Sequence, residues 1–159
     1  ALITRPKVIV ADEPVAMIDA SLRMNIVNIF KNLKEEYGVS FVYITHDLST
    51  AYYVSDYIAT MYKGSMIEFG RAREVLEHPG HPYTELLLDS IPKVGDKWTA
   101  KDRLRMGDAE DKVIRNAGCK FARRCPYAKD ACIQNPPNMV NLEGEHRSLC
   151  IKHTDYKAG

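Results

Sequence analysis

Two short apolar runs, each closed by polar residues, constrain the fold of this chain more than any other feature. Residues 7–11 read Lys-Val-Ile-Val-Ala and run into Asp12, Glu13 and Pro14. Residues 40–45 read Ser-Phe-Val-Tyr-Ile-Thr and run into His46. Short runs rich in β-branched and aromatic residues predict buried strands.

The segment between the two runs has the spacing of a helix. Apolar side chains recur at three- and four-residue intervals over residues 21–37, and Gly38 follows as a stop signal. A strand, a helix and a second strand in this order predict parallel strands with a right-handed crossover. The fold class is therefore α/β, with a mainly parallel sheet.

Further elements follow along the chain. Residues 57–62 and 65–69 predict a hairpin around Lys63-Gly64. Pro82 suits the first position of a helix that stops before Pro92, and His81 suits a turn or an N-cap. Short helices are expected over residues 48–55 and 71–77.

Composition excludes several classes of function. A net charge of +1 provides no overall field for nucleic acid. No apolar run approaches the ~20 residues that span a bilayer. A protein of this kind that works at a membrane docks on another protein there. The sequence starts with Ala1, close to a buried strand. We therefore expect upstream residues to be missing, and the strands to have unpaired edges and exposed apolar faces.

All four cysteines lie late in the chain, at Cys119, Cys125, Cys132 and Cys150. This segregation predicts a small separate module. No secretory signal is visible, so metal binding is favoured over disulfides. The spacing C-x5-C-x6-C-x17-C lacks the paired C-x2-C knuckles of structural zinc sites, and four thiolates suit an iron–sulfur cluster equally well. Iron–sulfur, zinc and no metal remain open, in that order.

The polar residues after the two strands predict one site, because the carboxyl ends of parallel strands meet at one edge of a sheet. Asp12, Glu13 and His46 would share that edge. One carboxylate can touch Mg²⁺ through water, a second can activate a water molecule, and an imidazole can hold a phosphate. The predicted chemistry is phosphoryl transfer. In isolation each residue has a plain interpretation as a solvated strand end.

In this order the segments resemble ABC-type ATPases. Residues 8–13 resemble the Walker B segment, residues 17–20 the D-loop, and residues 44–47 the switch-histidine loop. The His81-Pro82-Tyr83 element and the cysteine tail are similar to those of peptide-importer ATPase subunits. The resemblance covers nearly the whole chain except its variable stretch from residue 93 to 117.

The resemblance implies a role for each site residue. Asp12 would hold Mg²⁺ through water, Glu13 would be the general base, and His46 would sense the γ-phosphate of ATP. Asp19, in the D-loop, would communicate across an ATPase dimer. The four cysteines would hold a [4Fe–4S] cluster.

The resemblance also implies partners and a location. They are a second ATPase subunit, two transmembrane permease subunits and an extracytoplasmic peptide-binding protein, with this subunit peripheral on the cytoplasmic face of the membrane. The expected domains are residues 1–92, the latter part of a P-loop NTPase core, residues 93–117, a linker, and residues 118–159, a cysteine-rich module.

One departure limits the activity that this resemblance implies. No G-x-x-x-x-G-K-[ST] loop and no Leu-Ser-Gly-Gly-Gln type signature is present in the 159 residues. We expect the chain alone to be inactive as an ATPase. The alternatives are a non-enzymatic metal-binding or assembly module, and an ABC-type ATPase outside transport, which the His-Pro-Tyr element and the cysteines disfavour.

Overall fold

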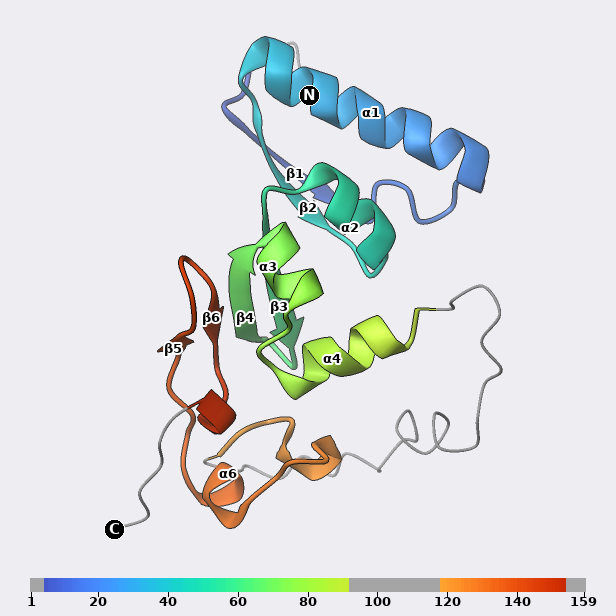
Figure 1. Ribbon diagram of the computed structural model, residues 1–159. Helices are drawn as coiled ribbons and strands as arrows, with labels where there is room; N and C mark the ends of the chain where they lie inside the picture. Colours follow the sequence, from blue (N-terminus) through green and yellow to red (C-terminus); the bar gives the residue numbers. More distant parts are fainter. Residues whose placement is uncertain (1–4, 92–117, 154–159) are drawn as a thin grey trace. The chain divides into compact units, whose positions relative to one another are not determined.

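The computed structural model describes residues 5–91 and 118–153 (Figure 1). Its contacts divide the chain into two units, Ala1–Asp56 and Tyr57–Gly159. The described elements of the first unit are β1 (Val8–Asp12), α1 (Ala20–Tyr37), β2 (Ser40–Ile44) and α2 (Leu48–Val54). The expected linker, residues 93–117, lies outside the described residues, and the expected domain boundaries stay a prediction.

The first unit has the strand–helix–strand arrangement that the sequence predicts. β1 and β2 pair in parallel, with Val8 opposite Ser40 and Asp12 opposite Ile44. α1 ends where Gly38 adopts a left-handed conformation, with φ of 62°, and donates its N–H to the carbonyl of Lys34. A left-handed residue is favourable only without a Cβ, which explains the glycine at this position.

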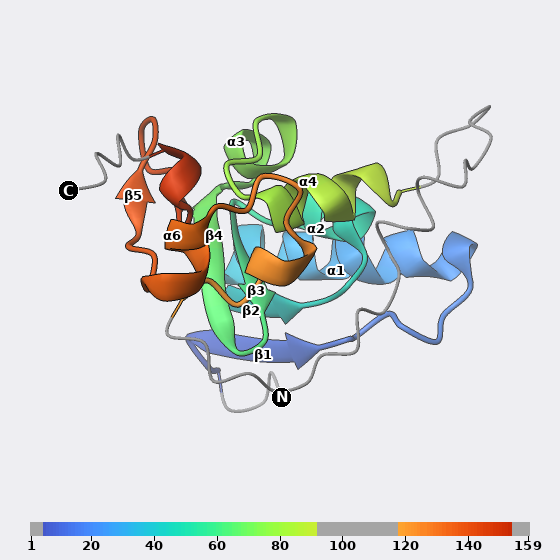
Figure 2. The ribbon, with the colours of Figure 1, turned by 90° about the horizontal axis from the view of Figure 1, so that it is seen from below.

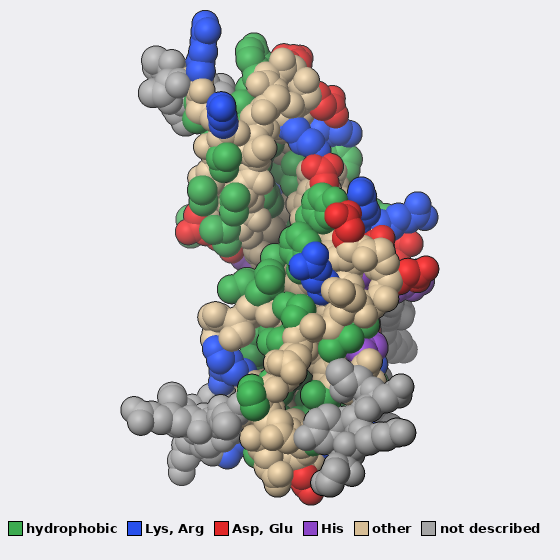
Figure 3. All heavy atoms as spheres, turned by 90° about the vertical axis from the view of Figure 1, so that its left-hand side faces the viewer, with side chains coloured by type: hydrophobic (Ala, Val, Ile, Leu, Met, Phe, Trp, Pro, Cys, Tyr) green, Lys and Arg blue, Asp and Glu red, His purple; other side chains and the backbone are tan. Residues whose placement is uncertain are grey.

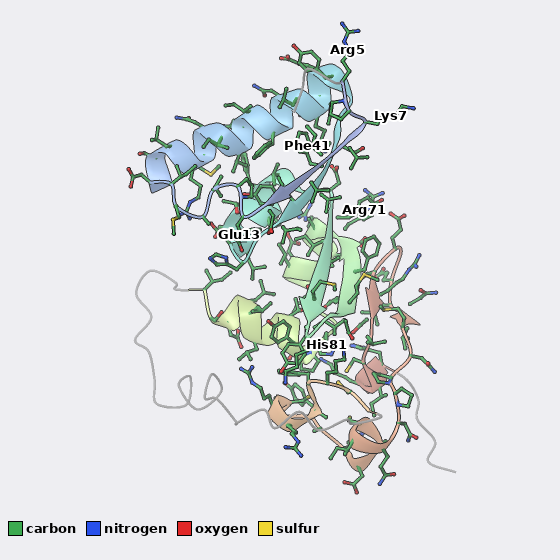
Figure 4. All side chains as sticks on the ribbon, turned by 180° about the vertical axis from the view of Figure 1, so that it is seen from behind. Arg5, Lys7, Glu13, Phe41, Arg71 and His81 are labelled. Carbon is green, nitrogen blue, oxygen red and sulfur yellow. The ribbon has the colours of Figure 1, made fainter. Side chains whose placement is uncertain are left out.

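One face of this strand pair packs against α1. The ring of Phe30, from α1, lies 5.3 Å from the ring of Phe41 and 6.0 Å from that of Tyr43. Figure 4 shows Phe41 on the side of the strands that faces the helix. Val27, also on α1, is completely buried. Burial of these apolar side chains stabilises the unit.

The opposite face of the pair is open. Its side chains Val8, Val10, Val42 and Ile44 are between 47% and 65% exposed. Hydrophobic side chains also contribute visibly to the surface seen in Figure 3. Parallel sheets are normally covered on both faces. The expectation of exposed apolar strand faces is confirmed.

The described elements of the second unit are mostly short. They are β3 (Tyr57–Tyr62), β4 (Ser65–Arg71), α3 (Ala72–Glu77), α4 (Pro82–Asp89), η2 (Ala122–Arg124), α6 (Asp130–Gln134), β5 (Val140–Asn141), β6 (Arg147–Ser148) and η3 (Ile151–His153). The strand order is β3-β4-β6-β5, and all three pairings are antiparallel. β3 and β4 lie side by side in Figures 1 and 2.

The expectation of a mainly parallel sheet was therefore wrong for the described residues. Only β1 and β2 are parallel there, and the larger sheet is antiparallel. The reason is the turn at Lys63-Gly64, where φ is 46° and 75°. Two consecutive positive φ values are typical of the tight turn that joins antiparallel strands.

The cysteine-bearing segment joins this sheet. β6 pairs with β4, with Glu68 opposite Ser148, and Leu149 donates its N–H to the carbonyl of Ile67. The expectation of a separate cysteine-rich domain is not confirmed. The two-residue strands β5 and β6 are too short to leave a detectable alternation in the sequence.

The His-Pro-Tyr element begins α4. His81 is the N-cap, and its Nδ1 accepts the N–H of Tyr83 at 3.0 Å. Pro82 follows in the first turn, where a missing N–H is harmless. The N-cap expectation for His81 is confirmed. The ring of Tyr83 lies 4.6 Å from that of Tyr62 and 5.5 Å from that of Phe121, at the core of this unit.

A buried carboxylate holds this region together. Glu68 is fully buried and accepts the N–H groups of Gly80, at 2.5 Å, and of His81, at 3.1 Å. The Nε2 atom of His146 lies 2.7 Å from the same carboxylate. A buried charge requires such partners, since desolvation alone strongly disfavours it. Glu68 thus links β4, the start of α4 and the turn before β6.

The environment of His81 makes the stability of the protein depend on pH. Burial, and then the charges of Lys152 and His153, lower the pKa of His81 from 6.5 to about 4. Between these pH values the unfolded state binds more protons than the folded state, so the free energy of unfolding falls as the pH falls from 6.5 towards 4. A pKa change of this size corresponds to at most about 3 kcal/mol.

We expect His81→Asn to reduce this loss of stability, because asparagine keeps an N-cap oxygen but does not titrate. The measurement is urea unfolding followed by circular dichroism at several pH values between 4 and 7. His78→Asn, at an exposed position after α3, is the matched control and should retain the wild-type slope. Equal slopes for wild type and His81→Asn would show that His81 is not the titrating group.

Candidate functional site

The parallel register of β1 and β2 brings the predicted site residues to one edge. Asp12, the last residue of β1, lies opposite Ile44, the last residue of β2. Glu13 then donates its N–H to the carbonyl of Ile44 at 2.9 Å. Both strands end at this hydrogen bond, so the residues that follow β1 and the residues that follow β2 lie close together.

Glu13 and His46 are in direct contact. His46 Nδ1 lies 2.7 Å from Glu13 Oε1. The side chains are 80% exposed for His46 and 38% exposed for Glu13, so both can be reached from solvent. Figure 4 shows Glu13 at the end of its strand. A carboxylate and an imidazole in contact can bind a polar ligand and move a proton between oxygen and nitrogen.

The backbone of Glu13 is unusual. Its φ is +46°, in the left-handed region. Such a conformation costs on the order of 1 kcal/mol for a residue with a Cβ, and it is found both in tight turns, as at Lys63, and at functional sites. The sequence carries no signal for this conformation.

Asp12 is exposed at the end of β1. Mg²⁺ prefers oxygen ligands and usually retains several of its waters, so a single exposed carboxylate can hold it through water. Asp12 fits that requirement, and Glu13 offers a second carboxylate beside it.

Asp19 lies at the end of the loop that follows Glu13. Its carbonyl accepts the N–H groups of Leu22 and Arg23, at 3.0 and 2.9 Å, and its side chain makes no capping hydrogen bond to α1. The neighbouring Met17 is fully exposed. The loop therefore presents side chains to solvent, as a contact with another molecule would require.

Two further residues of this region, Asp47 and Arg23, have no individual role predicted from the sequence. Asp47 caps α2 by accepting the N–H of Ser49 at 3.0 Å, and it forms a 3.0 Å ion pair with Arg23 of α1. An aspartate directly before a helix is a recognisable N-cap signal. Arg23 has no such signal, because its partner is 24 residues away.

The four cysteines are free thiols, and each is partly buried. Cys119 and Cys125 pack against the core of the second unit, and the N–H of Cys119 bonds to the carbonyl of Cys132 at 2.7 Å. Gly118 permits this approach, since a Cβ there would collide with the Cys132 carbonyl. Burial raises the pKa of Cys119, Cys125 and Cys150.

Within residues 5–91 and 118–153, no group of three or more His, Cys, Asp or Glu side chains is arranged to hold a metal ion. Two histidines near Cys150 already have hydrogen-bond partners. His146 contacts Glu68, and His153 contacts the carbonyl of Gly80 at 2.6 Å. No helix in this part of the chain is long and apolar enough to cross a membrane.

Comparison with known proteins identifies the relatives of this chain. Residues 67–132 match the family described as oligopeptide/dipeptide transporter, C-terminal region. A putative peptide import ATP-binding protein of Brucella ovis is 33% identical over 96% of this chain and 48% of its own length. The oligopeptide transport ATP-binding protein AppF of Bacillus subtilis is 34% identical over 94% of this chain and 46% of its own.

A third relative is the probable D,D-dipeptide transport ATP-binding protein DdpF of Escherichia coli. It is 40% identical over 83% of this chain and 43% of its own length. The chain thus spans about half the length of the curated relatives it matches. The chain is similar to ATP-binding proteins of peptide, oligopeptide and dipeptide transport, and its residues 67–132 match the oligopeptide/dipeptide transporter, C-terminal region.

Proposed function

We propose that this chain supplies part of the ATP-hydrolysing subunit of an ABC importer for dipeptides or oligopeptides. The observation that carries the proposal is the 2.7 Å contact between Glu13 and His46 at the ends of two parallel strands. Acids and histidines are common at strand ends, but these two converge in a chain similar to proteins described as peptide import and oligopeptide transport ATP-binding proteins.

Each residue has a part in hydrolysis. The Glu13 carboxylate accepts a proton from a water molecule while the water oxygen attacks the terminal phosphorus of ATP. The bond from that phosphorus to the bridging oxygen breaks, and ADP leaves. His46 holds the terminal phosphate in line through its imidazole. Its contact with Glu13 supports a shared role for the two side chains at one water molecule and one phosphate.

Asp12 is the residue that would hold Mg²⁺, through water. The ion would neutralise charge on the phosphates. Asp19 would communicate with a second ATPase subunit. The further partners in this proposal are two transmembrane permease subunits and an extracytoplasmic peptide-binding protein, with the ATPase peripheral on the cytoplasmic face of the membrane.

The phosphate-binding loop must come from outside these 159 residues, since no G-x-x-x-x-G-K-[ST] sequence is present in them. The competing function, a non-enzymatic metal-binding or assembly module, follows from the same fact. The two functions make different predictions: only the ATPase function requires Glu13 for ATP hydrolysis by the complete assembly.

We expect Glu13→Gln to lower the ATPase rate of the transporter assembly that contains this chain by at least about 100-fold, because a general base contributes roughly that factor. ATP binding should persist. Phosphate release is the measurement, and Glu36→Gln, at an exposed position of α1, is the matched control. The 159-residue chain alone should give no heat with Mg-ATP in calorimetry. An unchanged rate in Glu13→Gln would overturn the proposed catalytic role.

We also propose that Cys119, Cys125, Cys132 and Cys150 are the ligands of a [4Fe–4S] cluster. The packing of Cys119 and Cys125 on one core and the Cys119–Cys132 backbone bond support a common site. The spacing C-x5-C-x6-C-x17-C lacks the paired C-x2-C knuckles of structural zinc sites. A cluster occupies more space and carries its own sulfide, so it suits a wider set of thiolates.

Anaerobic reconstitution of the chain with iron and sulfide should give a brown protein with broad visible absorbance and about four irons per chain, the content of a [4Fe–4S] cluster. Each Cys→Ser variant should lose most of that colour because each removes a ligand. If the protein stays colourless and binds one zinc ion per chain, the four cysteines are a zinc site and not a cluster site. If the protein binds neither iron nor zinc, the proposal that the cysteines bind a metal is wrong.

A further inference from the structure

Arg23 connects two segments of the proposed site that are far apart in sequence. Its Nη1 donates to Asp47 Oδ2 at 3.0 Å, and its Nη2 donates to the carbonyl of Ile18 at 3.4 Å. The side chain is 34% exposed, and its Nε atom is enclosed, with no hydrogen-bond partner. The guanidinium is thus held between α1, the loop of residues 14–19 and the turn before α2.

The two carboxylate oxygens of Asp47 have different hydrogen-bond partners. Oδ2 pairs with Arg23, while Oδ1 caps α2 by accepting the N–H groups of Ser49, at 3.0 Å, and Thr50, at 3.4 Å. The N–H of Asp47 bonds to Thr45 Oγ1 at 3.0 Å. These contacts fix the turn in which His46 lies.

The two ends of this link adjoin the residues that matter most to the proposed function. Ile18 precedes Asp19, and Asp47 follows His46, which contacts Glu13. A guanidinium is a rigid plane, so its donors cannot move independently. A displacement of the loop at Ile18 would therefore move the guanidinium and, through it, the turn that carries His46.

We propose that Arg23 is a positioning residue that couples the loop of residues 14–19 to His46. The functional role of this coupling rests on the proposed function. Through it, a molecule that contacts the loop at Asp19 would change the alignment of His46 with Glu13. The competing description is a local ion pair that stabilises only the α2 cap. The two differ in whether the loop responds when Arg23 is changed.

Nuclear magnetic resonance of the 159-residue chain tests the coupling without ATP. In Arg23→Gln, we expect amide exchange at Ile18 and Thr50 to accelerate by about tenfold, the effect of losing a charge-assisted hydrogen bond. The ring signals of His46 should also shift. Arg73→Gln, which removes an exposed ion pair with Glu77, is the matched control and should change none of these signals.

Arg23→Lys separates coupling from simple stabilisation. A lysine ammonium can pair with Asp47 but lacks the planar fork that also reaches Ile18. Thr50 protection should return in this variant, while Ile18 exchange stays fast and the His46 ring signals stay displaced. If both sites recover, or if Arg23→Gln leaves Ile18 and the His46 ring at their wild-type values, the coupling proposal is wrong.

The outcome is independent of the proposed ATPase activity. If Glu13→Gln leaves ATP hydrolysis intact but the Arg23 variants behave as expected, the proposed function fails and the coupling stands. If hydrolysis depends on Glu13 but amide exchange at Ile18 is unchanged in the Arg23 variants, only the coupling proposal is wrong.

Discussion

The site depends on the parallel pairing of β1 with β2. Their register places Asp12 opposite Ile44, and the hydrogen bond from Glu13 to the Ile44 carbonyl extends the pairing by one residue. A shift of this register by one residue would turn the strand side chains to opposite faces. It would also separate Glu13 from His46. α1 maintains the register through the packing of Phe30 on Phe41 and Tyr43.

Where the sequence carries local signals, the fold could be predicted. Gly38 marks the end of α1 because only a residue without a Cβ takes its conformation at low cost, and Lys63-Gly64 marks the hairpin for a similar reason. Pro82 and His81 mark the start of α4. The proximity of Glu13 and His46 follows from strand direction alone.

The remainder depends on contacts that no local pattern encodes. β5 and β6 have two residues each and exist because β4 offers them a partner. Glu68 was expected only as a hairpin residue, yet burial and three hydrogen-bonding partners, Gly80, His81 and His146, make it a centre of the second unit. Arg23 likewise acquires its role from residues that meet it only after folding.

The proposed function requires that Glu13 and His46 act together on the terminal phosphate of ATP. A crystal structure of the complete ATPase assembly containing this chain, as the Glu13→Gln variant with Mg²⁺ and ATP, tests it most directly. We expect the terminal phosphate within hydrogen-bonding distance of His46, with a water between that phosphate and the side chain at position 13. A terminal phosphate bound away from the ends of β1 and β2 would contradict it.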